Sequence, residues 1–92
     1  MKIMKTFKSK KFNKNKFLKF DLSKYVFTSS KFNQCNFWES KLTNTRFIDS
    51  IINDSVFSDA KLNNSKFENC LIKNSNFSHS DLRNSDFSKS NL

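Results

Sequence analysis

Glycine and proline are absent from this chain of 92 residues, and tyrosine, tryptophan and histidine each occur once. Ordinary loops rely on Gly and Pro for their turns. Either the chain has few conventional loops, therefore, or another residue type makes its corners. Twelve residues are Phe, although hydrophobic residues make up only 36% of the chain. A chain of this length forms one domain at most, and an ordinary globular core of this size would be marginally stable.

Long apolar segments and export signals are missing as well. No apolar run approaches the roughly 20 residues of a membrane helix, and the basic N-terminus lacks the apolar stretch of a secretory signal. Two Cys without an export signal are typical of a reducing compartment. We therefore expect a cytoplasmic protein with no membrane partner.

Acidic residues do not occur among the first 20 residues, which hold eight Lys. Residues 21–92 hold nine Lys or Arg and eight Asp or Glu. The net charge of +9 therefore belongs to a short N-terminal segment, and the remainder of the chain is close to neutral.

A large apolar residue recurs at every fifth position from Phe7 to Leu92. A helix favours intervals of three and four, and a strand favours intervals of two. A period of five fits neither and indicates an internal repeat. The position two residues before the large one is small throughout Ser30 to Ser90, and the position two residues after it is mostly Asn or Asp from Asn44 on.

Each five-residue unit thus contains a small, a variable, a large, a variable and an Asx residue. Alternation along a very short strand sends the small and large residues to one side and the variable pair to the other. The fifth residue then turns the corner. A type II turn needs a positive φ at its third residue, which Asn tolerates best after Gly. Asn and Asp corners therefore replace glycine corners.

The large positions alternate between Phe and an aliphatic residue from Phe37 on, and Leu alternates with Ile among the aliphatic ones. This 20-residue rhythm predicts a coil with four sides. One inner wall is expected to stack Phe27, Phe47, Phe67 and Phe87. The opposite wall is expected to stack Phe17, Phe37, Phe57 and Phe77. Successive coils are expected about 4.8 Å apart, with the right-handed sense of parallel crossovers.

The units SDLRN, SDFSK, SNFSH, AKLNN, SKFEN and CLIKN resemble the motif of the pentapeptide repeat family, roughly A(D/N)LXX. The resemblance covers residues 20–92, whereas residues 5–19 follow only its phase. It implies an all-β fold, a right-handed quadrilateral parallel β-helix of about four 20-residue coils, in agreement with the spacing. We expect residues 1–19 to be a basic arm or irregular cap and residues 20–92 to form the β-helix.

The irregular cap is expected because Lys5 and Lys10 fall at small inward positions. Burying an unpaired ammonium group is prohibitive, so residues 1–15 are not expected to form a regular coil. Phe20 and Tyr25 also replace small inward residues, and they are expected to plug the first coil.

The N-terminal segment mixes Lys with Phe, a combination that binds single-stranded nucleic acid through phosphate contacts and base stacking. The candidate polyanion-binding residues are Lys8, Lys10, Lys11, Lys14, Lys16 and Lys19. The alternative is a solvated leader whose Phe residues only keep the phase of the repeat.

Catalytic chemistry is not expected. His79 lies at an outer corner, without a nucleophile arranged beside it. Cys35 and Cys70 take small inward positions nearly two coils apart on different walls, which excludes a disulfide. The chain has no metal-ligand spacing and no Gly-rich phosphate loop. We therefore predict a non-enzymatic protein with no cofactor and no metal.

Apolar residues at outward positions are the remaining functional signal. The candidate interaction residues are Trp38, Ile48, Ile51, Val56 and Leu71. Ile51 and Leu71 are expected to stack on one face, with Ile48 round the neighbouring corner. Trp38 is expected over Leu18 on another face, near Val56. Because an exposed Trp is a good binding hot spot, we predict a protein-binding scaffold with an unidentified protein partner. The alternatives are that these residues are merely tolerated, or that Trp38 packs on the arm.

The family resemblance also implies a more specific role. Some pentapeptide repeat proteins bind DNA gyrase, protect bacteria from quinolones or peptide toxins, and resemble DNA in shape and negative charge. The neutral body and basic N-terminus of this chain disfavour such a topoisomerase-directed resistance or immunity role. Relatives often pair through a terminal coil, so a homodimer through the C-terminal coil is a further expectation. A fragment of a longer protein is the alternative.

Overall fold

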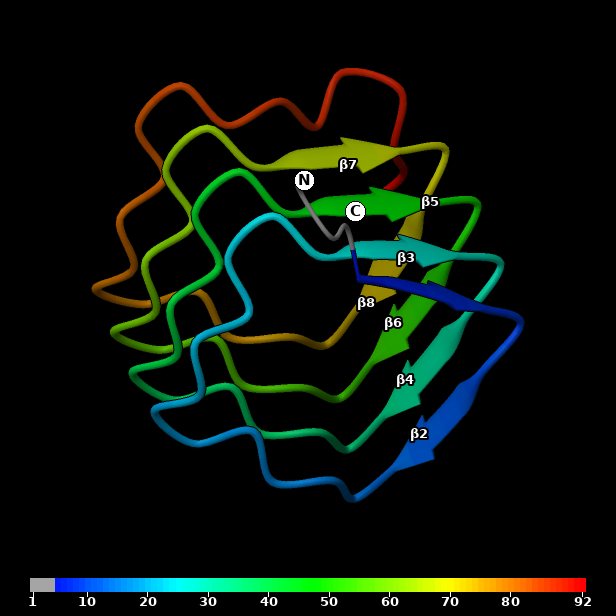
Figure 1. The fold of residues 1–92 in the computed structure, drawn as a ribbon, viewed down its shortest axis with the longest axis horizontal. Helices are drawn as coiled ribbons and strands as arrows, with labels where there is room; N and C mark the ends of the chain where they lie inside the picture. The colour runs from blue at the N-terminus through cyan, green and yellow to red at the C-terminus, as the bar shows by residue number, and fades with distance from the viewer. Residues whose placement is uncertain (1–4) are drawn as a thin grey trace.

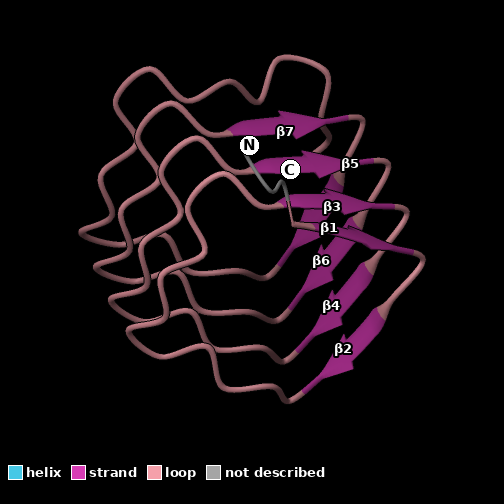
Figure 2. Cartoon of the chain, viewed as in Figure 1, coloured by secondary structure: helices cyan, strands magenta, loops and turns pink. Residues whose placement is uncertain are grey.

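The chain winds into a parallel β-helix with four walls, seen in a computed structural model that describes residues 5–92 (Figures 1 and 2). Two of the walls are four-stranded sheets. The first sheet contains β1 (Thr6–Lys8), β3 (Val26–Thr28), β5 (Arg46–Ile48) and β7 (Lys66–Glu68). The second contains β2 (Lys11–Asn13), β4 (Lys31–Asn33), β6 (Ile51–Asn53) and β8 (Leu71–Lys73). We call these the sheet walls.

The other two walls, which we call the turn walls, are held by isolated parallel bridges such as Lys16↔Asn36 and Lys41↔Lys61. Every bridge and every strand pair joins residues 20 positions apart, for example Phe27↔Phe47. This register confirms the predicted four-sided coil of 20 residues.

The large inward residues form the core, and their rings stack in the two predicted columns. In the first column the ring centroids of Phe47 and Phe67 lie 4.7 Å apart at an interplanar angle of 5°. In the second, Phe57 and Phe77 lie 4.7 Å apart at 1°. The columns meet edge to face, with 6.5 Å between the centroids of Phe47 and Phe57. Both arrangements are favourable for aromatic quadrupoles.

The corners lie where the five-residue unit predicts them. Every fifth residue from Ser9 to Asn84 has a positive φ, between 50° and 67°. At the ends of the turn walls the corner is a hydrogen-bonded turn, as where the Ser40 N–H donates to the Phe37 carbonyl at 2.9 Å. Asn and Asp take most of these positions from Asn44 on, as expected, but Lys, Ser, Gln, Glu and His adopt the same conformation elsewhere.

The expectation of an irregular N-terminal cap is wrong for residues 5–15, and residues 1–4 lie outside the described part of the chain. Strands β1 and β2 pair in register with β3 and β4, so the described part of the expected arm is the first coil. Lys5 and Lys10 are exposed there. Because this coil lies at the open end of the helix, their ammonium groups reach solvent and the burial cost disappears.

Candidate functional site

Two groups of apolar side chains lie on the outside of the walls. The first, which we call the tryptophan face, consists of Leu18, Trp38 and Val56 on one turn wall. Leu18 and Trp38 are each 37% exposed. They occupy equivalent positions in adjacent coils, which are joined here by a hydrogen bond from the Lys19 N–H to the Trp38 carbonyl at 3.0 Å. Val56 is half-buried between Asn36 and Asn76. The predicted placement of Trp38 over Leu18 is therefore confirmed.

Polar contacts hold the Trp38 side chain in place. Its indole N–H donates to Asp59 Oδ2 at 3.3 Å. Lys19 Nζ lies 5.5 Å from the ring centroid, a cation–π distance, and also 3.8 Å from Glu39 Oε1. An exposed aromatic ring is thus fixed by charged neighbours from two adjacent coils.

The second group, which we call the isoleucine face, joins the two sheet walls across a corner. Ile51 of β6 pairs with Leu71 of β8, and Ile48 lies at the end of β5. Ile51 is 38% exposed, whereas Ile48 and Leu71 are half-buried. The expected stack of Ile51 on Leu71 is confirmed, and its role in binding stays a prediction.

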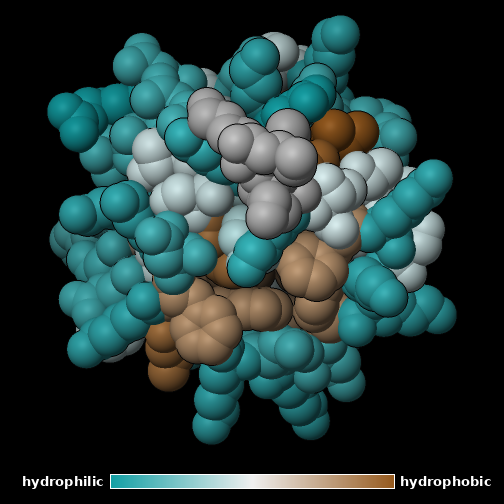
Figure 3. All heavy atoms as spheres, viewed as in Figure 1, coloured by the Kyte–Doolittle hydropathy of each residue, from teal (hydrophilic) through white to brown (hydrophobic). Residues whose placement is uncertain are grey.

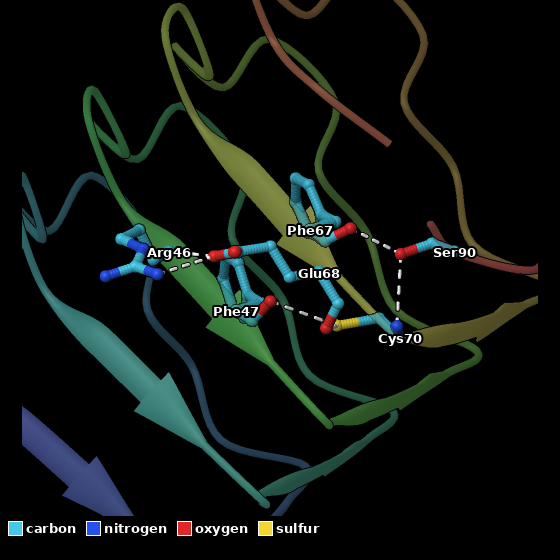
Figure 4. Close-up of polar contacts among 6 residues, drawn as sticks. All are labelled: Arg46, Phe47, Phe67, Glu68, Cys70 and Ser90. Carbon is cyan, nitrogen blue, oxygen red and sulfur yellow. Dashed lines mark hydrogen bonds and ion pairs between the residues drawn. The ribbon is translucent and has the colours of Figure 1, made fainter. Parts of the chain in front are cut away.

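Within residues 5–92, ion pairs on the outer walls are few and exposed. Arg46 donates from Nε and Nη2 to Glu68 Oε2 at 3.0 and 2.9 Å, between β5 and β7 (Figure 4). Arg83 donates to both carboxylate oxygens of Asp81. The hydrogen bonds from Arg83 lower the pKa of the Asp81 carboxyl. Such exposed pairs contribute little to stability.

The candidate polyanion-binding lysines are all exposed, and they surround the first coil instead of forming a linear arm. Lys8 and Lys11 flank the corner between β1 and β2, at which Lys10 lies. Lys14 follows β2, and Lys16 and Lys19 lie on the next wall. We call these six residues the lysine rim.

Aromatic residues fill the coil that the lysine rim surrounds. Phe7, Phe12 and Phe17 are half-buried, and Phe20 is 51% exposed, with its ring edge-on to Phe17 at 5.9 Å. Apolar side chains are visible there inside a hydrophilic border (Figure 3). Tyr25 stacks on Phe7 at 5.8 Å. Phe20 and Tyr25 thus pack against the aromatic rings of the first coil, as expected. They leave Phe7, Phe12 and Phe17 half-buried.

The sequence predicts this N-terminal end only in part. An inward Lys5 is expected to disrupt the coil, whereas in the structure its Nζ lies 5.5 Å from the Tyr25 ring centroid. The unbroken spacing of Phe7, Phe12 and Phe17 was the signal that the coil begins this early.

No group of three or more His, Cys, Asp or Glu residues suitable for a metal ion occurs within residues 5–92. His79 is exposed at a corner with a φ of 58°. Cys35 and Cys70 are free and buried, and their thiols donate to the carbonyls of Phe12 and Phe47 at 3.3 and 3.2 Å. Burial raises the pKa of both thiols. The two cysteines therefore act as small inward hydrogen-bond donors.

No helix with the length and apolar character needed to span a bilayer is found within residues 5–92.

The family description "Pentapeptide repeat region" matches residues 20–92, the stretch in which the small, large and corner positions recur most regularly. The chain belongs to the pentapeptide repeat family. The match begins at Phe20, after the part of the chain in which Lys5 and Lys10 replace small residues of the motif, although the β-helix of this pentapeptide repeat protein itself begins earlier.

Solved structures of pentapeptide repeat proteins resemble the fold at low sequence identity. The pentapeptide repeat protein Rfr23 from the cyanobacterium Cyanothece 51142 is 11% identical, with a TM-score of 0.43 over 95% of this chain and 83% of its own. Trypsin-treated QnrB1, a plasmid-mediated fluoroquinolone resistance protein, is 20% identical, with a TM-score of 0.45 over 97% of this chain and 54% of its own. A second trypsin-treated QnrB1 structure is 19% identical, with a TM-score of 0.39 over 95% of this chain and 56% of its own. This chain thus spans about half the length of QnrB1. No curated protein matches the chain.

Proposed function

We propose that this pentapeptide repeat protein is a non-catalytic binding module of the cytoplasm, whose outer walls contact a protein partner. The observation that carries this proposal is the state of Trp38, which is 37% exposed and yet is held by Asp59 and Lys19. Exposed Trp residues dominate the binding energy of many interfaces.

Rigidity supports the same conclusion. Association costs free energy for each side chain that is immobilised, and a side chain that is already fixed avoids much of this cost. The tryptophan face lies on a wall whose residues 36, 56 and 76 are joined by successive bridges. The wall therefore presents its side chains at fixed intervals to a partner.

A pull-down from the native host with the full chain tests the proposal. Trp38→Ala is expected to lose the partner, because the largest exposed side chain of the tryptophan face is removed. Asn63→Ala is the control, since Asn63 lies on the other turn wall and belongs to neither the tryptophan face nor the isoleucine face. Circular dichroism shows whether both variants remain folded. Retention of every captured protein by Trp38→Ala would contradict the proposal.

A topoisomerase-directed role has less support in this chain. Mimicry of DNA depends on an acidic surface, whereas residues 21–92 hold nine basic and eight acidic residues. A supercoiling assay with gyrase separates the two functions: no change in supercoiling on adding the protein is expected, and inhibition of the enzyme or its protection from a quinolone would favour the topoisomerase role.

Pairing of two copies through the C-terminal coil also stays a proposal. It is supported by the exposed apolar residues of that coil, Leu82 at 38% and Leu92 at 70%. Light scattering that shows only monomers at high protein concentration would remove it.

A further inference from the structure

The N-terminal end of the helix presents the faces of aromatic rings. Phe12 stacks on Phe32 with 4.9 Å between centroids and 17° between planes. Phe17 stacks on Phe37 at 4.8 Å and 12°. The second coil therefore covers one face of each first-coil ring, and the opposite face is directed out of the end. The Phe12 and Phe17 centroids lie 5.6 Å apart, with 75° between the ring planes. The end therefore presents two separate ring faces set steeply to each other, which together we call the aromatic floor.

The lysine rim surrounds this floor with positive charge. All six of its residues are exposed, and residues 5–20 include no Asp or Glu. Glu39, from the next coil, lies 3.8 Å from Lys19 Nζ, and the other five lysines of the rim form no ion pair within residues 5–92. A ligand of this end must therefore combine negative charge with a planar apolar group.

The opposite end shows that the charge is specific to the N-terminal end. Phe77 ends the column that begins at Phe17, and Phe87 ends the column that begins at Phe7; they stack on Phe57 and Phe67 at 4.7 and 4.4 Å. Residues 73–92 hold three basic and two acidic residues. The C-terminal coil of a second copy thus carries too little negative charge to complement the lysine rim.

The orientation of the rings argues against an anionic membrane as the ligand. Membrane-anchoring aromatic side chains protrude into the acyl region, whereas Phe12 and Phe17 lie parallel to the rings beneath them. A flat ring face instead matches a nucleobase, because base–aromatic stacking is the common contact of single-strand-binding proteins.

We propose that the N-terminal end of the β-helix binds single-stranded nucleic acid, with phosphates on the lysine rim and bases stacked on Phe12 and Phe17. This site shares only Lys19 with the tryptophan face, where Lys19 lies over the Trp38 ring. The variants below leave Lys19 unchanged, so the two proposals are tested separately.

Fluorescence anisotropy of a labelled oligothymidylate with the full chain tests the role of the lysine rim. In the variant Lys8→Gln/Lys11→Gln/Lys16→Gln, the slope of log K against log salt is expected to fall by about 2, because each phosphate contact to a single strand contributes roughly 0.7. The charge-matched control is Lys61→Gln/Lys66→Gln/Lys73→Gln, which removes three exposed lysines farther along the helix. Equal slopes for the two triple variants would overturn the assignment to the rim.

The aromatic floor is tested by Phe12→Leu/Phe17→Leu. Leu22 occupies the equivalent inward position of the same coil, so this change preserves the fold while removing both ring faces. Affinity for the oligonucleotide is expected to fall about tenfold, as for the loss of one stacked base, whereas affinity for inorganic polyphosphate stays unchanged. Phe77→Leu at the opposite end is the control and is expected to bind as the wild type does.

Three outcomes would overturn the proposal. The first is an unchanged oligonucleotide affinity of the Phe12→Leu/Phe17→Leu variant. The second is tighter binding to duplex DNA, whose bases are already stacked, than to the single strand. The third is binding to phosphatidylserine vesicles without binding to the oligonucleotide. Thermal melting of each variant establishes that a lost signal is not lost folding.

Discussion

The β-helix has two kinds of corner, which make the same bend with different hydrogen bonds. One kind follows a sheet wall and the other follows a turn wall. After a sheet wall, the small inward side chain provides the bonds: Ser50 Oγ donates to the Ile48 carbonyl at 2.9 Å and accepts the Ser30 N–H at 3.1 Å. Cys70 and Ser90 are joined in the same way, as the Cys70 N–H donates to Ser90 Oγ at 3.1 Å (Figure 4).

After a turn wall, the backbone itself makes the bond. The N–H groups of Ser40 and Ser65 donate to the carbonyls three residues earlier, at 2.9 and 3.1 Å. Their buried hydroxyls have no partner within the described chain, and Ala60 takes an equivalent position. Thr45, with a longer reach, donates to the Leu22 carbonyl of the preceding coil at 3.1 Å.

The difference shows that one five-residue motif serves two structural purposes. A hydroxyl after a sheet wall accepts a backbone N–H of the preceding coil. After a turn wall that N–H donates to the carbonyl three residues earlier instead, and Ala60 shows that a small side chain is sufficient there. In the first coil even that requirement is relaxed, and the positions equivalent to Ser40 and Thr45 are taken by Phe20 and Tyr25. The predictions below separate volume from hydrogen bonding.

The largest effect is expected at the large inward positions, where the two kinds of wall are equivalent. Phe47 of a sheet wall and Phe57 of a turn wall are both fully buried. Phe47→Ala and Phe57→Ala are each expected to lower the free energy of unfolding by about 3–5 kcal/mol, because each removes a ring from the middle of a column. Urea unfolding followed by circular dichroism measures both.

Asn63→Ala is the control for these two variants, because Asn63 lies on an outer wall and accepts one hydrogen bond, from Thr43 Oγ1 at 3.0 Å. Its effect is expected within about 0.5 kcal/mol. Unfolding midpoints of Phe57→Ala and Asn63→Ala that coincide would contradict the inward and outward assignment.

A medium effect is expected for Ser50→Ala, at a corner after a sheet wall. The change leaves the buried Ser30 N–H without its acceptor, and an unpaired buried donor costs about 1–3 kcal/mol. Ser50→Cys introduces the residue type that Cys70 has at the equivalent corner, and it is expected to lose less stability than Ser50→Ala. An unfolding midpoint of Ser50→Ala equal to that of the wild type would show that this hydroxyl does not link the coils.

Ser40→Ala provides the opposite result at a corner after a turn wall. The same chemical change removes a hydroxyl without a partner, so stability is expected to stay constant or rise by up to about 1 kcal/mol. The same unfolding experiment measures it. Equal destabilisation by Ser40→Ala and Ser50→Ala would remove the distinction between the two kinds of corner.

The repeat made the fold predictable because every coil obeys the same rule. The rings of each column are spaced 20 residues apart, from Phe27 to Phe87 in one and from Phe17 to Phe77 in the other. The column of each ring therefore follows from its residue number alone. The two kinds of corner were not predictable, because Ser40 and Ser50 are identical in the motif and differ only in the wall that precedes them. The sequence does not predict the coil formed by residues 5–15, because the free-energy cost of a Lys at an inward position depends on whether another coil covers it. Trp38 was placed correctly, but its bond to Asp59 requires the exact register of two coils.

The smallest effect is expected from the thiols at corners after sheet walls. Burial raises the pKa of Cys35 and Cys70 in the folded state, so folding favours the protonated thiols. The corresponding stability is present in full below the pKa of an unfolded thiol and is lost as the pH rises through the folded pKa. Between about pH 8 and pH 10 the wild type is expected to lose more thermal stability than Cys35→Ser/Cys70→Ser, whose hydroxyls do not titrate. The two proteins differ only at these two positions, so the difference between their melting temperatures isolates the thiols. Parallel melting curves across this range would show that the two thiols are not buried inside the coil.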